Sequence, residues 1–224
     1  KNERFFEQFV GPTSRKFINR LKGIESESSG FEPVNDNMRA SNGGAMKIGP
    51  VACFGKGDME KTIDIAKVIC MPTHGNRISM SAACAVAAAV CGALNGKDLF
   101  GIFKDAMSGA EKGEAIGAAG NTVAGPSFPK RLQSAIALGM NANDLSEAMD
   151  TLRSYFDCSG MAADSVPVSF GLMAAAKGDV MAAVQAAANI GNDTDTMATI
   201  VGAVLGAKNG VHAFPEELVR KLDE

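Results

Sequence analysis

The chain has 224 residues, 46% hydrophobic and 21% charged, which is enough apolar sequence for one sizeable core, so we expect a single domain. The net charge is −3, and there is no basic tail or long run of one charge; this argues against nucleic acid as a main partner, because nucleic-acid binding needs a concentrated basic face. The five cysteines are an odd number without C-x-x-C spacing, which indicates a reduced, cytoplasmic protein with mostly buried thiols.

The start of the chain is already apolar. It opens at Lys1 without a methionine and passes directly into Phe5, Phe6 and Phe9, so we expect that an N-terminal segment of the same protein precedes it. Gly11-Pro12-Thr13-Ser14 then opens a short helix ending near Leu21, because proline fits the first turn of a helix. A polar loop or lid is expected over residues 23–38.

From residue 57 onward the chain repeats one pattern: a helical run, a glycine, an acidic N-cap and another helical run. No segment has the alternation of a strand. Short Gly-Asp connections imply antiparallel neighbours, so the prediction is an all-α fold, a compact orthogonal bundle of many helices. The helices are expected at 59–70, 78–93, 99–110, after Asp144, at 167–177, 180–190 and 197–207, and after Pro215.

Two predicted helices should be central, because the small residues of 78–93 and 197–207 allow close approach of helix backbones. The uncharged run 78–96 is nearly long enough to span a bilayer, but it is weakly apolar, so we expect a buried helix and no membrane partner. A bent or broken helix is expected over 113–130. An irregular connection is expected over 155–164, before Ser165-Val166-Pro167.

Asp193-Thr194-Asp195-Thr196 stands between two apolar segments, where ionised carboxylates are costly to bury unless they are paired, capped or bound to a metal. Residues two apart do not face each other within a helix, so the acids can converge only where a loop enters a helix N-terminus. There they either form a simple N-cap cluster or, with the threonine hydroxyl, bind a hard cation such as Mg²⁺ or Mn²⁺.

Two further stretches are candidate binding elements. Asn42-Gly43-Gly44 is either a turn into a helix or a backbone cradle for an anion. Thr73-His74 precedes the alanine-rich helix, where a histidine commonly serves as a cap or a satisfied polar residue.

Taken in order, these stretches resemble the ADP-ribosylglycohydrolase family, which includes ADP-ribosyl-arginine and ADP-ribosyl-serine hydrolases, the dinitrogenase reductase-activating glycohydrolase and the J1 crystallins. Residues 189–203 (NIGNDTDTMATIVGA) resemble its hallmark, and 41–48 (SNGGAMKI) look like its N-G-x-x-M-R segment. Thr73-His74, Ser165-Val166-Pro167 and Gly11-Pro12-Thr13 match weaker elements. Their order and spacing agree across nearly the whole chain.

The resemblance implies a binuclear Mg²⁺ or Mn²⁺ site with Asp193, Asp195 and Thr196 as ligands. The two aspartates would be the catalytic residues in that they hold the metals rather than attack. The resemblance also implies an ADP-ribose pocket, with Gly11 and Thr13 near the diphosphate and His74 near the nucleotide part. Its other lining residues would be Ser41, Asn42, Gly43, Gly44 and Met46.

Three departures from the family pattern bear on this reading. Lys47 stands where the family usually has arginine, which is not equivalent in bidentate contacts. Asn192 replaces a commoner glycine and could narrow the pocket or add a polar contact. The early Gly-Asp start, the Thr-Asp-Asp or Ser-Asp-Asp triplet and a catalytic acid are not found upstream of Gly11, so we expect an N-terminally incomplete domain that holds half of the metal site.

The leading hypothesis is a metal-dependent hydrolase of an N- or O-glycosidic bond to ADP-ribose, with the general base in the absent segment or a metal-bound water. One alternative is a hydrolase of another ribosyl compound such as a nucleoside, to which Lys47 and Asn192 point weakly. Another is a non-catalytic ADP-ribose-binding or structural protein, against which the intact pair of acids argues.

Overall fold

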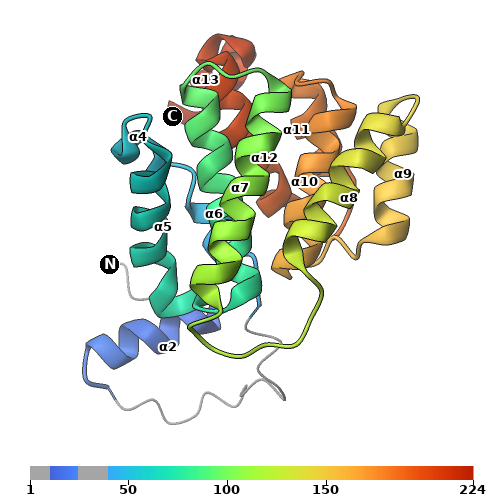
Figure 1. Cartoon of the computed structure of the whole chain (residues 1–224). Helices are drawn as coiled ribbons and strands as arrows, with labels where there is room; N and C mark the ends of the chain where they lie inside the picture. The colour runs from blue at the N-terminus through green and yellow to red at the C-terminus, as the bar shows by residue number, and fades with distance from the viewer. Residues whose placement is uncertain (1–10, 25–39, 224) are drawn as a thin grey trace.

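The computed structural model describes residues 11–24 and 40–223. Within this part the secondary structure is helical apart from two isolated β-bridges, which confirms the predicted all-α fold in a single domain (Figure 1). The predicted apolar start at Phe5 and almost all of the predicted loop 23–38 lie outside the described residues. The helices are α2 (Pro12–Leu21), α3 (Gly43–Lys47), α4 (Val51–Gly55), α5 (Met59–His74), α6 (Arg77–Leu94), α7 (Leu99–Gly117), α8 (Phe128–Asn141), α9 (Leu145–Tyr155), α10 (Ala162–Ala175), α11 (Val180–Asn189), α12 (Thr194–Asn209), the 3-10 helix η2 (Val211–Ala213) and α13 (Glu216–Asp223).

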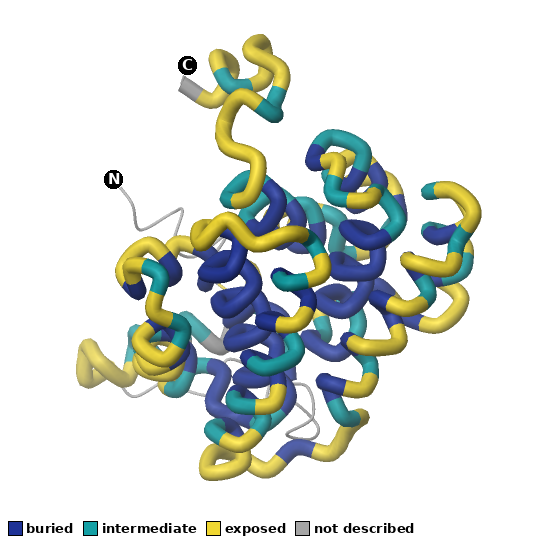
Figure 2. Tube along the Cα trace, turned by 45° about the horizontal axis from the view of Figure 1, so that its top comes forward, coloured by how far each residue is buried: buried dark blue, intermediate teal, exposed yellow. Residues whose placement is uncertain are grey.

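Helix α6 is the centre of the core. Every residue from Ile78 to Ala93 is buried, and helices α3, α4, α5, α7, α10 and α12 all pack against it. The dark buried trace in Figure 2 runs through this part of the molecule, whereas the C-terminal turns stand away from it and are largely exposed. Among the described helices, α6 alone is long and apolar enough to cross a membrane, and 89% of it is buried inside the fold. The prediction of a buried central helix is confirmed for 78–93, whereas the second predicted central helix, α12, packs against α6, α10 and α11 but is only partly buried.

Helices α6 and α7 pack closely through a row of glycines. Gly109, Gly113 and Gly117 follow each other at four-residue spacing, so they share one face of α7. A Cβ atom on each would collide with a backbone carbonyl of the opposing segment, at Cys84, Met80 and Asn76 respectively. The predicted break over 113–130 is therefore misplaced: Gly113 and Gly117 belong to a continuous helix, and the irregular connection is 118–127.

Two predicted helix starts are also wrong, because both helices begin earlier than expected. Helix α10 begins at Ala162, so Pro167 lies inside it rather than at its start. Helix α12 begins at Thr194, three residues before the predicted start. In contrast, four predicted acidic N-caps are confirmed, each accepting a hydrogen bond from the backbone N–H three residues later: Asp58, Asp98, Asp144 and Asp179.

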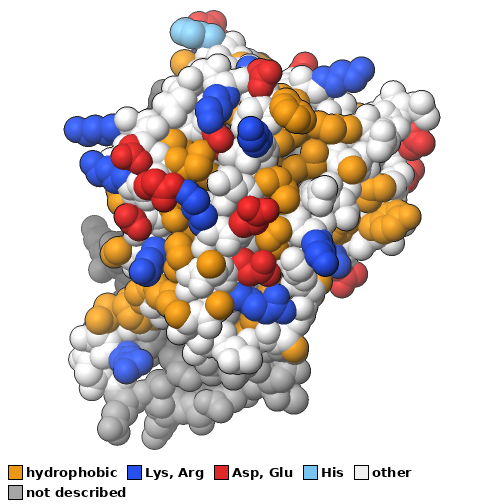
Figure 3. All heavy atoms as spheres, viewed as in Figure 1, with side chains coloured by type: hydrophobic (Ala, Val, Ile, Leu, Met, Phe, Trp, Pro, Cys, Tyr) orange, Lys and Arg blue, Asp and Glu red, His pale blue; other side chains and the backbone are white. Residues whose placement is uncertain are grey.

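The surface carries both signs of charge. Lysine and arginine are interspersed with aspartate and glutamate on the face shown in Figure 3, with hydrophobic side chains between them. All five cysteines are free, and only Cys53 is exposed, as predicted for mostly buried thiols.

The glycine row predicts a steep cost for one added methyl group. We expect Gly113→Ala to lower the free energy of unfolding by about 1 to 3 kcal/mol, because overpacking forces the two helices apart. Gly202→Ala is the matched control: this glycine lies in α12 with no atom within 4 Å of its Cβ position, and alanine there should raise stability by about 0.5 to 1 kcal/mol through helix propensity. Urea denaturation measures both, and an unchanged midpoint for Gly113→Ala would contradict the packing argument.

Candidate functional site

Asp193 occupies the N-cap position of α12 but does not cap it. Its backbone is non-helical (φ −82°, ψ 57°), and its side chain accepts no hydrogen bond from a backbone N–H in the first turn of its helix. Its own N–H donates to Cys158 O at 3.0 Å, which ties the start of α12 to the connection between α9 and α10. The carboxylate is thereby available to side-chain groups instead of the backbone of its own helix.

That carboxylate is held by two side chains from different parts of the chain. The amide Nδ2 of the buried Asn42 donates to Asp193 Oδ2 and, at 2.7 Å, to Ser165 Oγ. The hydroxyl of Thr196, one turn into α12, donates to Asp193 Oδ1 at 3.0 Å. Hydrogen bonds to a carboxylate are about twice as strong as neutral ones, so Asp193 is fixed from both sides.

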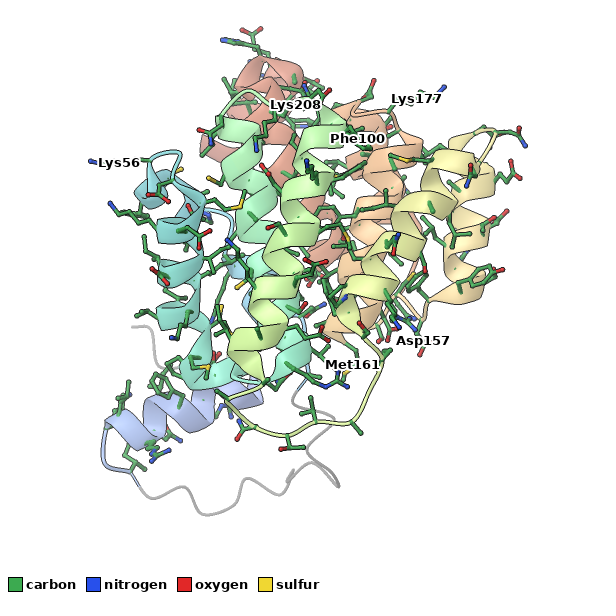
Figure 4. The ribbon with its side chains drawn as sticks, viewed as in Figure 1. Lys56, Phe100, Asp157, Met161, Lys177 and Lys208 are labelled. Atoms are coloured by element: carbon green, nitrogen blue, oxygen red, sulfur yellow. The ribbon has the colours of Figure 1, made fainter. Side chains whose placement is uncertain are left out.

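The position of Asn42 is in turn set by a short antiparallel bridge. Its N–H donates to Gly160 O at 2.9 Å, and the N–H of Ala162 donates to Ala40 O at 2.9 Å, pairing Ser41 with Met161. Met161 is labelled in Figure 4, at the lower end of α10. The chain before α3 and the chain before α10 therefore run side by side at the site.

His74 packs against the two glycines that follow Asn42. It is buried at the end of α5, and Nδ1 lies 2.7 Å from Thr73 Oγ1. A Cβ atom on Gly43 would come within 2.8 Å of His74 Nε2, and one on Gly44 within 3.4 Å of the His74 side chain. Both glycines thus make room for the histidine. Burial, with the Lys47 charge as a smaller cause, lowers the pKa of His74 from 6.5 to about 4.

The two acids of the hallmark differ in environment, which corrects the expectation that both are buried. Asp193 is half-buried, but Asp195 is exposed in the first turn of α12. Among the described residues, the Asp195 carboxylate has no hydrogen bond or ion pair. The apolar residues on either side of the hallmark suggested that its acids are buried. The first two residues of α12 are not buried, however, and burial begins at Thr196.

The other predicted site residues differ in whether they lie close to Asn42 and Asp193. Met46 is exposed, and its sulfur lies 3.9 Å from Thr196 Oγ1. Gly11 is the exposed N-cap of α2, which packs against α5, and no described contact joins it to Asn42 or Asp193. The side chain of Thr13 lies outside the described part of the chain.

The two departures from the family pattern that are single residues, Lys47 and Asn192, both lie in the described part of the chain. Lys47 is exposed in the last turn of α3. Asn192 has a left-handed backbone (φ 59°), and its amide donates to Asp157 O at 2.6 Å. Its polar contact is therefore with the backbone of the α9–α10 connection.

Sequence reasoning missed two groups at the site. Ser165, quoted only as part of a motif, receives the Asn42 amide from inside α10. The carbonyls of Cys158 and Gly160 accept the N–H groups of Asp193 and Asn42. Ser165-Val166-Pro167 could have pointed to the serine, but backbone carbonyls leave no mark in a sequence.

The oxygen atoms at the site are of the kind that a hard cation binds. Two carboxylates and a threonine hydroxyl offer the oxygen ligands that Mg²⁺ and Mn²⁺ prefer, and no basic side chain among the described residues pairs with Asp193. The set is small, however: within residues 11–24 and 40–223 no group of three or more His, Cys, Asp or Glu side chains could hold a metal. An octahedral shell here needs further ligands.

Comparison with known proteins identifies the family of the chain. The family model for ADP-ribosylglycohydrolase matches residues 2–224, so the chain belongs to that family. It is also similar to a protein of Escherichia coli (strain K12) described as "Uncharacterized protein YegU", with 27% identity over 224 residues. That match covers 99% of this chain and 64% of the relative. The chain therefore spans slightly less than two thirds of the length of that curated protein.

The buried neutral His74 predicts a pH-dependent stability. Its pKa in the folded chain, about 4, lies below its ordinary value of 6.5, so the unfolded chain binds the proton first and stability falls as pH drops from 6.5 toward 4. The loss due to this residue should reach about 3 kcal/mol below pH 4.

Urea denaturation at pH 7.5, 6 and 5 measures the effect. The His74→Gln variant should lose less stability over this range than the unmodified chain. The His212→Gln variant changes an exposed histidine and should keep the original pH dependence. Parallel curves for the unmodified chain and His74→Gln would contradict the prediction.

Proposed function

We propose that the protein is a metal-dependent hydrolase that cleaves an N- or O-glycosidic bond to ADP-ribose. The family to which the chain belongs carries glycohydrolase activity in its description. The single observation that supports the proposal most is the hydrogen bond from Asn42 to the Asp193 carboxylate, across 151 positions of sequence. It joins the two stretches that carry the family's motifs into one site.

The residues take separate roles in this proposal. Asp193, Asp195 and Thr196 would hold Mg²⁺ or Mn²⁺, and the bound cations would supply charge stabilisation as the glycosidic bond breaks. Asn42 keeps the Asp193 carboxylate in place. The sugar-nucleotide pocket would be lined by Ser41, Gly43, Gly44, Met46 and His74, of which His74 packs against the two glycines and Met46 lies beside Thr196. The roles of Gly11 and Thr13 toward the diphosphate rest on the resemblance alone.

The neutral state of His74 supports its place in such a pocket. A burial-depressed pKa keeps the imidazole uncharged at pH 7, so one ring nitrogen can accept and the other can donate a hydrogen bond. Thr73 engages Nδ1. Nε2, next to Gly43, is the ring nitrogen on the side of the Asn42 segment.

The remaining cation ligands and the general base would come from water or from protein residues outside the described part of the chain. An additional N-terminal segment of the same protein is our proposed source, in line with a curated relative of which the chain covers 64%. We also propose a cytoplasmic enzyme whose partner is the ADP-ribosyl substrate, without a nucleic-acid or membrane partner. Free cysteines, mixed surface charge and the buried position of α6 support this.

Hydrolysis of ADP-ribosyl-arginine and ADP-ribosyl-serine, with free nucleosides as competing substrates, tests the proposal. We expect release of ADP-ribose that needs Mg²⁺ or Mn²⁺ and stops with chelator. Asp195→Asn should lower kcat/KM on the order of a hundredfold, because it weakens a cation ligand. Asp150→Asn, which changes an exposed aspartate of α9, should leave activity unchanged.

Three results would contradict the proposal. Turnover unaffected by chelator or by Asp195→Asn would exclude the metal role. Preferred cleavage of nucleosides would favour another ribosyl substrate. Calorimetric binding of ADP-ribose without turnover of any conjugate would identify a non-catalytic binder.

A further inference from the structure

Arg131 makes an unusually complete set of contacts for a partly exposed arginine. From α8, its Nε donates to Ala163 O and its Nη2 to Asp164 Oδ1, each at 2.6 Å. The flat guanidinium lies over the Phe156 ring, 4.5 Å from its centroid. These contacts all go to the 156–164 segment, which comprises the connection from α9 to α10 and the first residues of α10.

Pro167 explains why Ala163 O is free to take part. In a regular α10 this carbonyl would accept the N–H of the residue four positions later, but that residue is proline and has no N–H. The carbonyl is left with an open position, and Arg131 Nε fills it. The interior proline therefore creates the acceptor that fixes the arginine.

Asp164 extends the contact into the middle of the segment. Its second oxygen, Oδ2, accepts the hydroxyl of Ser159 at 3.1 Å, and Ser159 Oγ accepts the N–H of Met161 at 3.3 Å. Arg131 thus holds Phe156 at one end of the segment and Ala163 at the other. Through Asp164 it also holds Ser159 between them.

The same segment holds the two residues on which the candidate site depends. Cys158 O accepts the N–H of Asp193 at 3.0 Å, and Gly160 O accepts the N–H of Asn42 at 2.9 Å. Figure 4 shows the labelled Asp157 and Met161 of this segment at the lower ends of α9 and α10. The contacts of Arg131 and these two backbone hydrogen bonds therefore meet in one segment.

We propose that Arg131 is a positioning residue of the site, which sets Asn42 and Asp193 by holding the 156–164 segment. It does not touch the Asp193 carboxylate in the structure. Its effect on catalysis rests on the proposed function, but its effect on the segment does not. Lysine cannot replace it, because one ammonium cannot donate to Ala163 O and Asp164 in a fixed fork while stacking flat on Phe156.

Hydrogen exchange tests the inference without any substrate. In Arg131→Lys, exchange at the backbone amides of Asn42 and Asp193 should rise at least about tenfold, because these amides open when the segment loosens. Amides in the middle of α6 should be unchanged. Ser159→Ala, a milder variant that removes the Ser159 hydroxyl from Asp164 and Met161 but leaves Arg131 in place, should raise exchange at the same two amides to a smaller degree.

Asp105→Asn is the matched control. It breaks another partly buried ion pair, between Lys97 Nζ and Asp105 Oδ2 at 2.7 Å, which connects the α6–α7 turn to α7. This variant should leave the Asn42 and Asp193 amides as they are in the unmodified chain. Unchanged exchange at both amides in Arg131→Lys, or an equal rise in Asp105→Asn, would overturn the inference.

Kinetics then separate this inference from the proposed function. If the unmodified protein hydrolyses an ADP-ribosyl substrate, Arg131→Lys and Asn42→Ala should each lower kcat/KM, and the double variant should lose less than the product of the two single losses, because both changes act on the contact between Gly160 and Asn42. Additive losses would overturn the link through Asn42. If the unmodified protein neither binds nor hydrolyses ADP-ribosyl compounds, the proposed function fails while the exchange result still decides the role of Arg131.

Discussion

The Asp193 carboxylate keeps its place because a neutral amide donates to it from the protein interior. Asn42 brings no charge, so it orients the carboxylate without neutralising it, as a lysine or arginine partner would. Its second acceptor, Ser165, is buried within α10, and its backbone is bonded to Gly160. A carboxylate held in this way is fixed in orientation by neutral donors, and that property makes it useful for binding a cation or a sugar hydroxyl.

The helical bundle supplies the stiffness that such an arrangement needs. Small side chains along α6 and the glycine row of α7 let two backbones meet with no side chain between them, and the tight contact leaves little freedom for either helix to shift. The start of α6 then serves the site directly: Ser79 donates to Ser41 O at 2.9 Å, next to Asn42. The core and the candidate site are thus continuous through the first turn of one helix.

Sequence reasoning predicted the parts of the molecule that depend on local chemistry. Glycines and acidic N-caps marked most helices, and the motifs at Asn42 and Asp193 named residues that the fold brings into contact. It failed where the outcome depends on distant partners. Flanking apolar residues could not show that Asp195 faces solvent. In the sequence, Pro167 favours a helix start. Nothing there shows that a side chain from α8 supplies the hydrogen-bond donor that a proline inside the helix lacks. The contribution of the 156–164 segment is made largely by carbonyls, which every residue has.

The separation of Asn42 and Asp193 along the chain has a kinetic consequence. Their hydrogen bond closes a loop of 151 positions, whereas the glycine row pairs α6 with its immediate successor, α7. Local contacts of the second kind form early in folding, and contacts between remote segments wait until the intervening chain has been ordered. A nascent or partly unfolded chain would therefore contain most of its helices but no assembled site. Occupancy of that site by a ligand would select the fully folded molecule, so that ligand binding and completion of the fold become a single event.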